Sequence, residues 1–316
     1  MSVYTSVSPE QLGEILSEFE LGGLLGFEGI AAGIENTNYF LTTSAGKFVL
    51  TIFETLPVGE LDYFLELMAH LADRNIPNPV PVKTRGESFL GSVSGKPCAV
   101  VNRLEGKSVS VPTKDNCWQV GAALAQLHLA AADFEGRRVN DRGGAWRAGV
   151  LQKAADCLPA EDLGLIDALG TIADIESWQS VPQGVVHADL FRDNVLFAGE
   201  QLSGIIDFYY AFNGPLIYDL AIVAADWAWV PFMYFEPQRA AALVAGYTSV
   251  RPVLECEVEL WTDALAAAGL RFYLSRVHDM CFPKSGERTQ LKDPAPFAAL
   301  FRATMESRSH FLSVWE

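Results

Sequence analysis

The sequence predicts an α+β fold in two parts: a small antiparallel sheet with one packed helix, followed by a larger, mainly helical part. The chain has 316 residues, half of them hydrophobic, which is enough for roughly two domains of ~100–200 residues. Short β-rich runs dominate the early chain, whereas a long Ala/Leu-rich tract begins near Asn116. The chain turns polar at Leu104–Lys107, so we expect one domain over 1–103 and a second over 104–316.

The first part contains two β-rich runs and two helical patterns. Weak helical spacing before the glycine-rich segment Gly22–Gly26 predicts a short N-terminal helix. Asn38–Thr43 and Lys47–Phe53 flank Ser44-Ala45-Gly46, which is typical of a β-hairpin. Helically spaced apolar residues between Pro57 and Asn75 predict an amphipathic helix packed on this sheet. Further short strands are expected at Val80–Val82 and Cys98–Asn102.

The second part is helical apart from one β-rich region. Apolar residues from Asn116 onward recur at helical spacing, and helices are also expected from about 144 to 178 and from 215 to the end. Three short β runs stand close together between these helices, at Gly184–His187, Val195–Phe197 and Leu202–Phe208. The polar residues of greatest chemical interest lie beside these runs.

The net charge disfavours two classes of binding partner, and the N-terminal sequence bears on the cellular location. Lys and Arg number 23 against 39 Asp and Glu, giving a formal charge of −16 that repels nucleic acid and anionic membrane surfaces. The first residues lack the basic and apolar regions of a signal peptide, and no long apolar run occurs, so we expect a cytoplasmic location. The sequence makes no prediction of the oligomeric state.

The five cysteines are odd in number, scattered, and never spaced as C-x-x-C. This pattern argues against a disulfide framework or a structural zinc site. We therefore expect free, mostly buried thiols.

A constellation of polar residues follows the H-x-D-x₄-N pattern with His187, Asp189 and Asn194, and Asp207 comes soon after. If 194–208 folds as a hairpin centred between 200 and 201, Asn194 faces Asp207 with their Cα atoms about 5 Å apart. Such an oxygen pair suits Mg²⁺, and Asp189 lies within reach of the same end of the hairpin.

These residues offer the chemistry of phosphoryl transfer. A carboxylate such as Asp189 can orient an attacking hydroxyl and accept its proton, while metal ions neutralise the phosphates. A lone H-x-D would more often cap a turn, but the whole set of four residues favours catalysis. His187 fits a structural role, because buried loop histidines commonly hydrogen-bond the backbone.

Several segments together resemble the aminoglycoside phosphotransferase and choline kinase family, which has a bilobal protein-kinase-like fold. The likeness extends over His187–Phe197 and, in both parts of the chain, over Gly33–Phe40, Pro57–Leu71, Ile205–Ala211 and Tyr218–Ile222. Within the family, these segments look like the homoserine kinase branch. The resemblance implies an enzyme that uses ATP and Mg²⁺ to phosphorylate the side-chain hydroxyl of homoserine.

The resemblance also implies roles for individual residues. Asp189 matches the catalytic base, Asn194 and Asp207 match the magnesium ligands, and Asp219 matches a residue that braces the catalytic loop from a helix. The first part would bind the nucleotide, with the adenine against Cys98–Asn102, centred on Val101.

Two departures from related kinases qualify the resemblance. Protein kinases commonly carry a lysine two residues after the base, and Phe191 stands there instead, which favours a small metabolite as the acceptor. The strand lysine that holds the α- and β-phosphates is replaced by Thr51, and Lys47 is ~13 Å away along the strand. The phosphates would then be held by Mg²⁺ and by the segment Glu35, Asn36, Thr37 and Asn38.

Homoserine is a zwitterion, so its site needs a cation for the carboxylate and an anion or aromatic face for the ammonium. Arg192, Tyr209 and Asp226 are residues of these types near the predicted base. Arg192 could instead pair with Asp193 or Asp219, in which case Arg271 and Arg276 are the next candidates for the carboxylate.

Two alternatives remain open from the sequence. Aminoglycosides, choline or methylthioribose could be the acceptor within the same fold. A pseudokinase, which would bind nucleotide without turnover, is supported by the missing strand lysine and opposed by the intact set Asp189, Asn194 and Asp207.

Overall fold

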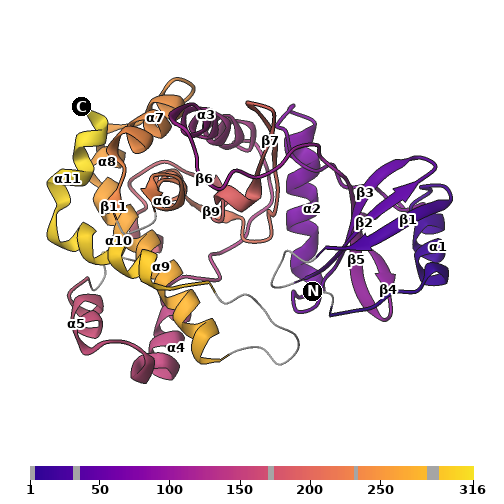
Figure 1. The fold of residues 1–316 in the computed structure, drawn as a ribbon, viewed down its shortest axis with the longest axis horizontal. Helices are drawn as coiled ribbons and strands as arrows, with labels where there is room; N and C mark the ends of the chain where they lie inside the picture. The colour runs from indigo at the N-terminus through magenta and orange to yellow at the C-terminus, as the bar shows by residue number, and fades with distance from the viewer. Residues whose placement is uncertain (1–3, 31–35, 170–173, 231–233, 283–291) are drawn as a thin grey trace. The chain divides into compact units, whose positions relative to one another are not determined.

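The structure is a computed structural model that describes residues 4–30, 36–169, 174–230, 234–282 and 292–316 (Figure 1). The chain forms two compact units, and the division falls between Glu105 and Gly106. The boundary expected from the sequence lies two residues earlier, between 103 and 104.

The first unit contains one antiparallel sheet with the strand order β1-β2-β3-β5-β4. The predicted hairpin is formed by β2 and β3, which pair from Thr37↔Ile52 to Thr43↔Gly46. Strands β1 and β4 were not predicted, because glycines and polar residues interrupt their apolar pattern. The elements are α1 (Pro9–Glu18), β1 (Leu24–Gly29), β2 (Thr37–Thr43), β3 (Gly46–Ile52), α2 (Val58–Ala72), β4 (Gly91–Val93) and β5 (Lys96–Asn102).

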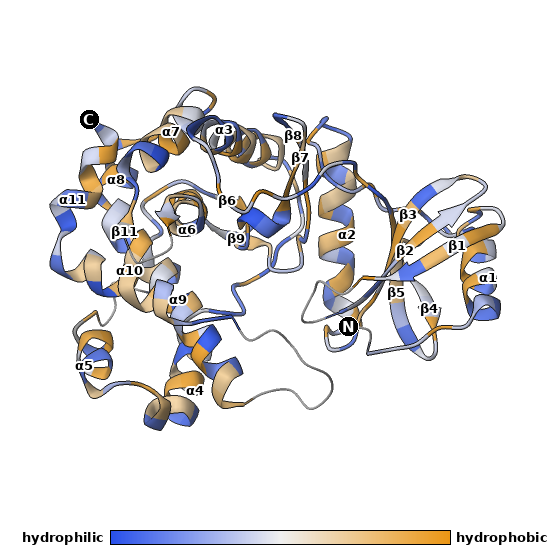
Figure 2. Cartoon of the chain, in the orientation of Figure 1, coloured by the Kyte–Doolittle hydropathy of each residue, from blue (hydrophilic) through white to orange (hydrophobic). Residues whose placement is uncertain are grey.

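A helix covers one face of this sheet. Helix α1 starts with a capping box, in which the Ser8 hydroxyl accepts from the Gln11 backbone N–H and the Gln11 side chain accepts from the Ser8 N–H. Its buried residues form a core with the inward residues of the sheet, namely Leu12, Ile15, Leu16, Phe19, Tyr39, Leu41, Leu50, Ile52, Cys98 and Val100. Hydrophobic and hydrophilic residues alternate along the turns of α2, as the sequence predicts (Figure 2).

The second unit is mainly helical, as predicted. Its helices are α3 (Lys114–Ala130), α4 (Gly144–Ala154), α5 (Ala160–Leu169), α6 (Leu216–Trp227), α7 (Pro237–Thr248), α8 (Glu255–Glu259), α9 (Trp261–Cys281), α10 (Ala295–Glu306) and α11 (Arg308–Leu312), with short 3₁₀ turns η1 (Ala155–Cys157), η3 (Ile175–Ser177), η4 (Arg192–Asn194) and η5 (Ser313–Trp315). Within the described ranges, no helix is both long and apolar enough to cross a membrane.

Helix α6 forms the centre of this unit and contacts α3, α7 and α9 (Figure 1). Two glycines allow α3 and α7 to approach closely. A Cβ on Gly121 would lie 2.0 Å from the Leu243 carbonyl oxygen, and a Cβ on Gly246 would lie 1.9 Å from that of Trp118. Larger residues would therefore push the two helices apart.

Short strand pairs carry the predicted site. β6 (Gln183–Val186) pairs with β9 (Phe212–Pro215), and β7 (Val195–Ala198) pairs with β8 (Gln201–Ile205). Another small pair is formed by β10 (Trp229–Val230) and β11 (Tyr234–Phe235). The predicted runs correspond to β6, β7 and β8, although β8 ends at Ile205 and β9 was not predicted.

The expectation of free thiols is wrong for two of the five cysteines. Cys157 at the end of η1 and Cys281 at the end of α9 form a disulfide with their Cα atoms 6.8 Å apart. The two residues are 124 positions apart in the sequence, so spacing along the chain gives no sign of the pairing. Cys98, Cys117 and Cys256 are free.

Candidate active site

The loop after β6 is clamped in a strained conformation. Ala188 has a φ of 63°, which costs an L-residue about 1–2 kcal/mol. The backbone N–H groups of His187 and Ala188 donate to the two carboxylate oxygens of Asp219 at 2.7 and 2.8 Å. On the other side, the Arg271 guanidinium donates to the Ala188 carbonyl at 2.5 Å. These contacts fix the peptide that leads into Asp189.

Asp219 in turn ends a buried chain of polar side chains. His128 bridges it to Tyr247, with ring nitrogens 3.0 Å from the carboxylate and 2.7 Å from the phenol oxygen. Arg251 donates to Tyr247 at 3.2 Å and to both oxygens of Glu257 at 3.0 Å. Burial alone would raise the pKa of Asp219, but the hydrogen bond and charge of His128 hold it below the usual value. The sequence gives no sign of this support, because its members are spread over 130 positions.

The His187 side chain links the loop to the end of β8. Burial lowers the pKa of His187, so the ring is neutral. With Nε2 donating to the Ile206 carbonyl at 3.1 Å, Nδ1 is left to accept the Asp189 N–H at 3.3 Å. These contacts hold the ring between the loop and the end of β8.

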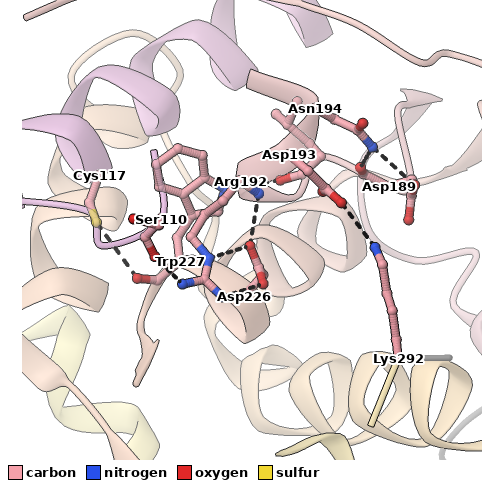
Figure 3. Close-up of polar contacts among 10 residues, drawn as sticks. Ser110, Cys117, Asp189, Arg192, Asp193, Asn194, Asp226, Trp227 and Lys292 are labelled. Carbon is pink, nitrogen blue, oxygen red and sulfur yellow. Dashed lines mark hydrogen bonds and ion pairs between the residues drawn. The ribbon is translucent and has the colours of Figure 1, made fainter. Parts of the chain in front are cut away.

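Asp189 and Asn194 are held together across the short turn η4. The Asn194 amide nitrogen donates to the Asp189 carbonyl at 2.8 Å and to its carboxylate at 3.1 Å (Figure 3). Among the described residues, no donor reaches the remaining amide oxygen of Asn194. Burial, and next the negative charge of Asp207, raise the pKa of Asp189 well above its usual value.

The predicted register of the β7–β8 hairpin is wrong by one residue. Ala198 pairs with Gln201 and not with Ser203, so the turn contains only Gly199 and Glu200, and an irregularity after Leu196 then reduces the offset from two residues to one. As a result the Asn194 carbonyl accepts from the Ile206 N–H at 2.9 Å, and Asn194 does not face Asp207. Asp207 follows the paired region with a φ of 67° and an exposed side chain.

The oxygens at this end of the hairpin fit a hard cation. Asp207 supplies a carboxylate, Asn194 an amide oxygen, and the two nearby carboxylates Asp189 and Asp207 repel each other in the absence of a cation. The described residues contain no group of three or more His, Cys, Asp or Glu side chains that could hold a metal. A cation held by Asp207 and the Asn194 amide oxygen would complete its shell with phosphate and water, which is the coordination that Mg²⁺ takes.

Arg192 and Asp226, both predicted to bind the substrate, bind each other instead. The guanidinium donates to the two carboxylate oxygens at 2.9 and 3.0 Å and to the Ser110 carbonyl at 2.9 Å. Figure 3 shows Arg192 turned toward Asp226 and away from Asp189. Of the two partners considered from the sequence, Asp193 is instead paired with Lys292 at 2.9 Å. Tyr209 is half-buried in the loop after Asp207.

The predicted phosphate-binding segment is partly occupied by contacts within the first unit. Glu35 lies outside the described residues. The Thr37 hydroxyl is buried, donates to Glu54 at 2.6 Å, and accepts from the backbone N–H of Thr5 at 3.0 Å. Asn36 is also buried, and its amide oxygen accepts from the Glu54 N–H at 3.4 Å. Thr37 therefore has no hydroxyl proton left for a ligand.

Thr51, in the place of the missing lysine, bonds to Asn38 directly across the sheet. The Thr51 hydroxyl donates to the Asn38 amide oxygen at 2.7 Å, which turns the Asn38 NH₂ group the other way. The NH₂ group lies 3.5 Å from the Asn36 carbonyl, at the limit of a hydrogen bond. The NH₂ group of Asn38 is thus a hydrogen-bond donor beside Thr51, the position at which related kinases carry the lysine.

The backbone of Val101 is not available for adenine. Arg103 N–H donates to Lys47 at 3.0 Å, and Phe53 N–H donates to Pro97 at 3.0 Å. In an antiparallel ladder, hydrogen-bonded pairs alternate with pairs that are not hydrogen-bonded. The pair of Val101 with Val49 is therefore hydrogen-bonded, and the N–H and C=O of Val101 both point toward Val49. A backbone contact to adenine, expected at Val101, would therefore have to come from a residue nearer the end of β5.

Sequence comparison identifies the family. The model of the phosphotransferase enzyme family matches residues 26–253, well over half of the chain. The chain belongs to this family. This phosphotransferase is therefore an enzyme, a kinase that uses ATP.

The phosphotransferase is similar over its full length to curated bacterial enzymes. The homoserine kinase of Methylobacillus glycogenes is 44% identical over 315 residues, covering 100% of this chain and 99% of the relative. The homoserine kinase of Methylobacillus flagellatus is 42% identical with the same coverage. Among solved structures, amicoumacin kinase in complex with AMP-PNP, Ca²⁺ and Ami has a TM-score of 0.69 at 17% identity, covering 94% of this chain and 93% of that one. This likeness confirms the predicted protein-kinase-like fold.

Replacing Arg192 by leucine is expected to destabilise the phosphotransferase by about 1–3 kcal/mol, because the largely buried Asp226 loses its partner. Urea unfolding followed by tryptophan fluorescence measures the effect. The control Asp193→Asn breaks the exposed pair with Lys292 and should change the free energy of unfolding by less than about 0.5 kcal/mol. Unchanged stability of Arg192→Leu with a strongly raised KM for the acceptor would instead support the original substrate role.

Proposed function

We propose that this phosphotransferase is a homoserine kinase, which transfers the γ-phosphoryl group of ATP to the side-chain hydroxyl of L-homoserine. The product, O-phospho-L-homoserine, serves threonine biosynthesis, and we propose a cytoplasmic location. The main support is full-length identity of 44% and 42% to two homoserine kinases, in a chain that holds Asp189 and Asn194 together beside Asp207.

In this proposal, Asp189 orients the homoserine hydroxyl and accepts its proton as the oxygen bonds to the γ-phosphorus. The bond from the γ-phosphorus to the bridging oxygen breaks, ADP leaves, and Asp189 later returns the proton to solvent. Asp219, Arg271 and His187 hold the loop, and Asn194 holds the carboxylate by its amide nitrogen. Their contribution is a fixed geometry at the reacting oxygen.

We further propose that Asp207 and the Asn194 amide oxygen hold Mg²⁺. The ion would neutralise charge on the phosphates, which is the main requirement of phosphoryl transfer. A cation would also relieve the repulsion between Asp207 and Asp189 and thereby favour the ionised form of the base.

The first unit is proposed to bind the nucleotide and the second to provide catalysis and acceptor binding. The NH₂ group of Asn38, oriented by Thr51, is the best-placed donor for the phosphates among the described members of the predicted segment. We place the backbone contacts to adenine at Leu104 in place of Val101, because Leu104 follows the last ladder bond of β5.

A kinase for aminoglycosides, choline or methylthioribose is the principal alternative. Kinases for several acceptors share this fold, so the fold does not select the acceptor. A pseudokinase is less well supported, because a protein without turnover has no need of the contacts that hold the loop before Asp189 in place.

The test is a panel of acceptors with purified protein, ATP and MgCl₂. Homoserine should be phosphorylated fastest, with ADP release measured by a coupled assay and the phosphomonoester identified by ³¹P NMR. Faster turnover of choline, methylthioribose or kanamycin would overturn the substrate assignment. ATP binding without turnover of any acceptor would support the pseudokinase alternative.

A further inference from the structure

A pocket opens within the second unit, and Arg271 is part of its lining. About 300 Å³ of empty space, open solvent included, lies among its lining residues, which include Asn140, Arg142, Trp146, Arg147, Tyr218 and Arg271. The lining comes from the segment before α4, from α4 itself, and from α6 and α9. Arg271 contacts the carbonyl of Ala188, the residue immediately before Asp189. Arg271 therefore connects the lining of the pocket to the residue next to the proposed base.

Arg271 is buried without a carboxylate partner. Its side chain is only 7% exposed, and among the described residues no carboxylate lies within ion-pair distance of its guanidinium. Its hydrogen-bond and ring contacts are with neutral groups, namely the Ala188 carbonyl, the Tyr218 hydroxyl, and the rings of Tyr210 and Phe272 at 5.4 and 4.5 Å, while the carboxyl group of Asp189 interacts with it from beyond ion-pair distance. A guanidinium in such surroundings is costly to bury, so an anion in the pocket would be bound strongly.

A second arginine of the pocket is held against the same ring. Arg142 lies 5.5 Å from the centre of the Tyr210 ring, donates to the Tyr210 hydroxyl at 3.3 Å, and lies 5.2 Å from the Trp146 ring. Tyr210 follows Asp207 by three positions, so it ties both arginines to the loop of the proposed metal ligand. Planar guanidinium groups fixed in this way match the two oxygens of a carboxylate.

We infer that this pocket takes the carboxylate of an amino-acid acceptor, bound by Arg271 and Arg142. The inference rests on the proposed function and names the residues that bind the far end of its substrate. In homoserine the carboxyl carbon and the hydroxyl oxygen are four bonds, or about 5 Å, apart. A carboxylate at Arg271 therefore leaves the hydroxyl within reach of Asp189, which is next to the residue that Arg271 contacts.

The charge of the pocket also separates the competing acceptors. Choline and aminoglycosides are cations, which two arginines repel, and methylthioribose has no anionic group to pair with them.

An acidic side chain that could bind the ammonium group of an amino acid lies beside the pocket. Glu176 accepts from Asn140 at 3.1 Å, and a Cβ on Gly143 would lie 2.0 Å from its carboxylate, so a glycine is needed there.

The experiment compares two acceptors that differ only in the carboxylate, homoserine and 3-aminopropan-1-ol. Arg142→Gln and Arg271→Gln are each expected to raise KM for homoserine by about 10- to 100-fold, while KM for ATP changes little. On 3-aminopropan-1-ol, kcat/KM of the variants should fall far less, because that acceptor has no carboxylate to lose contact with. Arg137→Gln is the matched control, since Arg137 is an exposed arginine of the preceding segment that bonds only backbone carbonyls.

Equal losses on both acceptors would overturn the inference and leave the arginines as supports of the loop. If Arg271→Gln does not fold, Arg271→Lys and Arg142→Gln decide the matter, because Arg142→Gln leaves the hydrogen bond of Arg271 to the Ala188 carbonyl in place. If the wild type does not phosphorylate homoserine, the proposed function is wrong. The inference then stands only if the acceptor that is phosphorylated best carries a carboxylate.

Discussion

Asparagine in place of Asp189 is expected to lower kcat with homoserine by about 10²–10⁴-fold, because the amide cannot accept the proton of the attacking hydroxyl. The affinity for ATP should change little. The backbone frame survives the change, since Asn194 also donates to the carbonyl of residue 189 and Asp219 holds the preceding peptide groups. Steady-state kinetics and ATP titration by calorimetry measure the two quantities separately.

Asp193→Asn is the matched control for this change. Asp193 is a neighbouring carboxylate that is exposed and paired with Lys292, so its loss should leave kcat within about twofold of wild type. An Asp189→Asn enzyme that keeps kcat within tenfold of wild type would remove Asp189 from the role of base.

The sequence predicts the site well where the contacts are local. His187, Asp189, Asn194 and Asp207 lie within about one loop and one hairpin, so their spacing alone indicates that they gather. The spacing does not predict which residues of the two strands pair, because the length of the turn and one irregularity between Leu196 and Phe197 shift the register by a residue. The spacing of such a motif therefore predicts which residues lie close together, but it does not predict which side chains face each other.

Contacts across long stretches of sequence explain most of what was missed. Arg192 is three residues after the predicted base in the motif, yet its side chain is bound by Asp226, 34 residues later in the sequence. Arg271 is 83 residues from Ala188 and contacts it directly, which no spacing argument reveals. The same limit applies to the disulfide between Cys157 and Cys281 and to the chain from Asp219 to Glu257, since each depends on how the helices pack.

The fold was predictable where hydrophobic periodicity is strong. The β2–β3 hairpin and α2 follow their patterns closely, whereas Leu24–Gly29 carries glycines and an acidic residue and still forms β1. Pairing with β2 from Phe27↔Leu41 to Gly29↔Tyr39 provides the stabilisation that the residues of β1 lack. Tertiary pairing thus overrides the local propensity of this segment.

Asparagine in place of Asp207 is expected to raise the Mg²⁺ concentration for half-maximal activity by about tenfold or more, because a charged ligand becomes a neutral one. Asparagine is the suitable replacement because residue 207 has a φ of 67°, a conformation that asparagine tolerates better than alanine does. Asn194→Ala should raise the requirement less, since it removes an uncharged oxygen, but it should also lower kcat through the lost contact with Asp189.

Magnesium titrations at saturating ATP and homoserine distinguish these effects for Asp207→Asn, Asn194→Ala and a control in the same hairpin. Glu200→Gln removes one negative charge at the exposed turn between β7 and β8, so it tests whether net charge alone changes the response to Mg²⁺. The control should titrate like wild type, because surface charges beyond about 10 Å are largely screened at ordinary ionic strength. If Asp207→Asn keeps the wild-type magnesium requirement, its carboxylate is not a metal ligand. The repulsion between Asp207 and Asp189 would then need another explanation, such as a cation bound through the nucleotide alone.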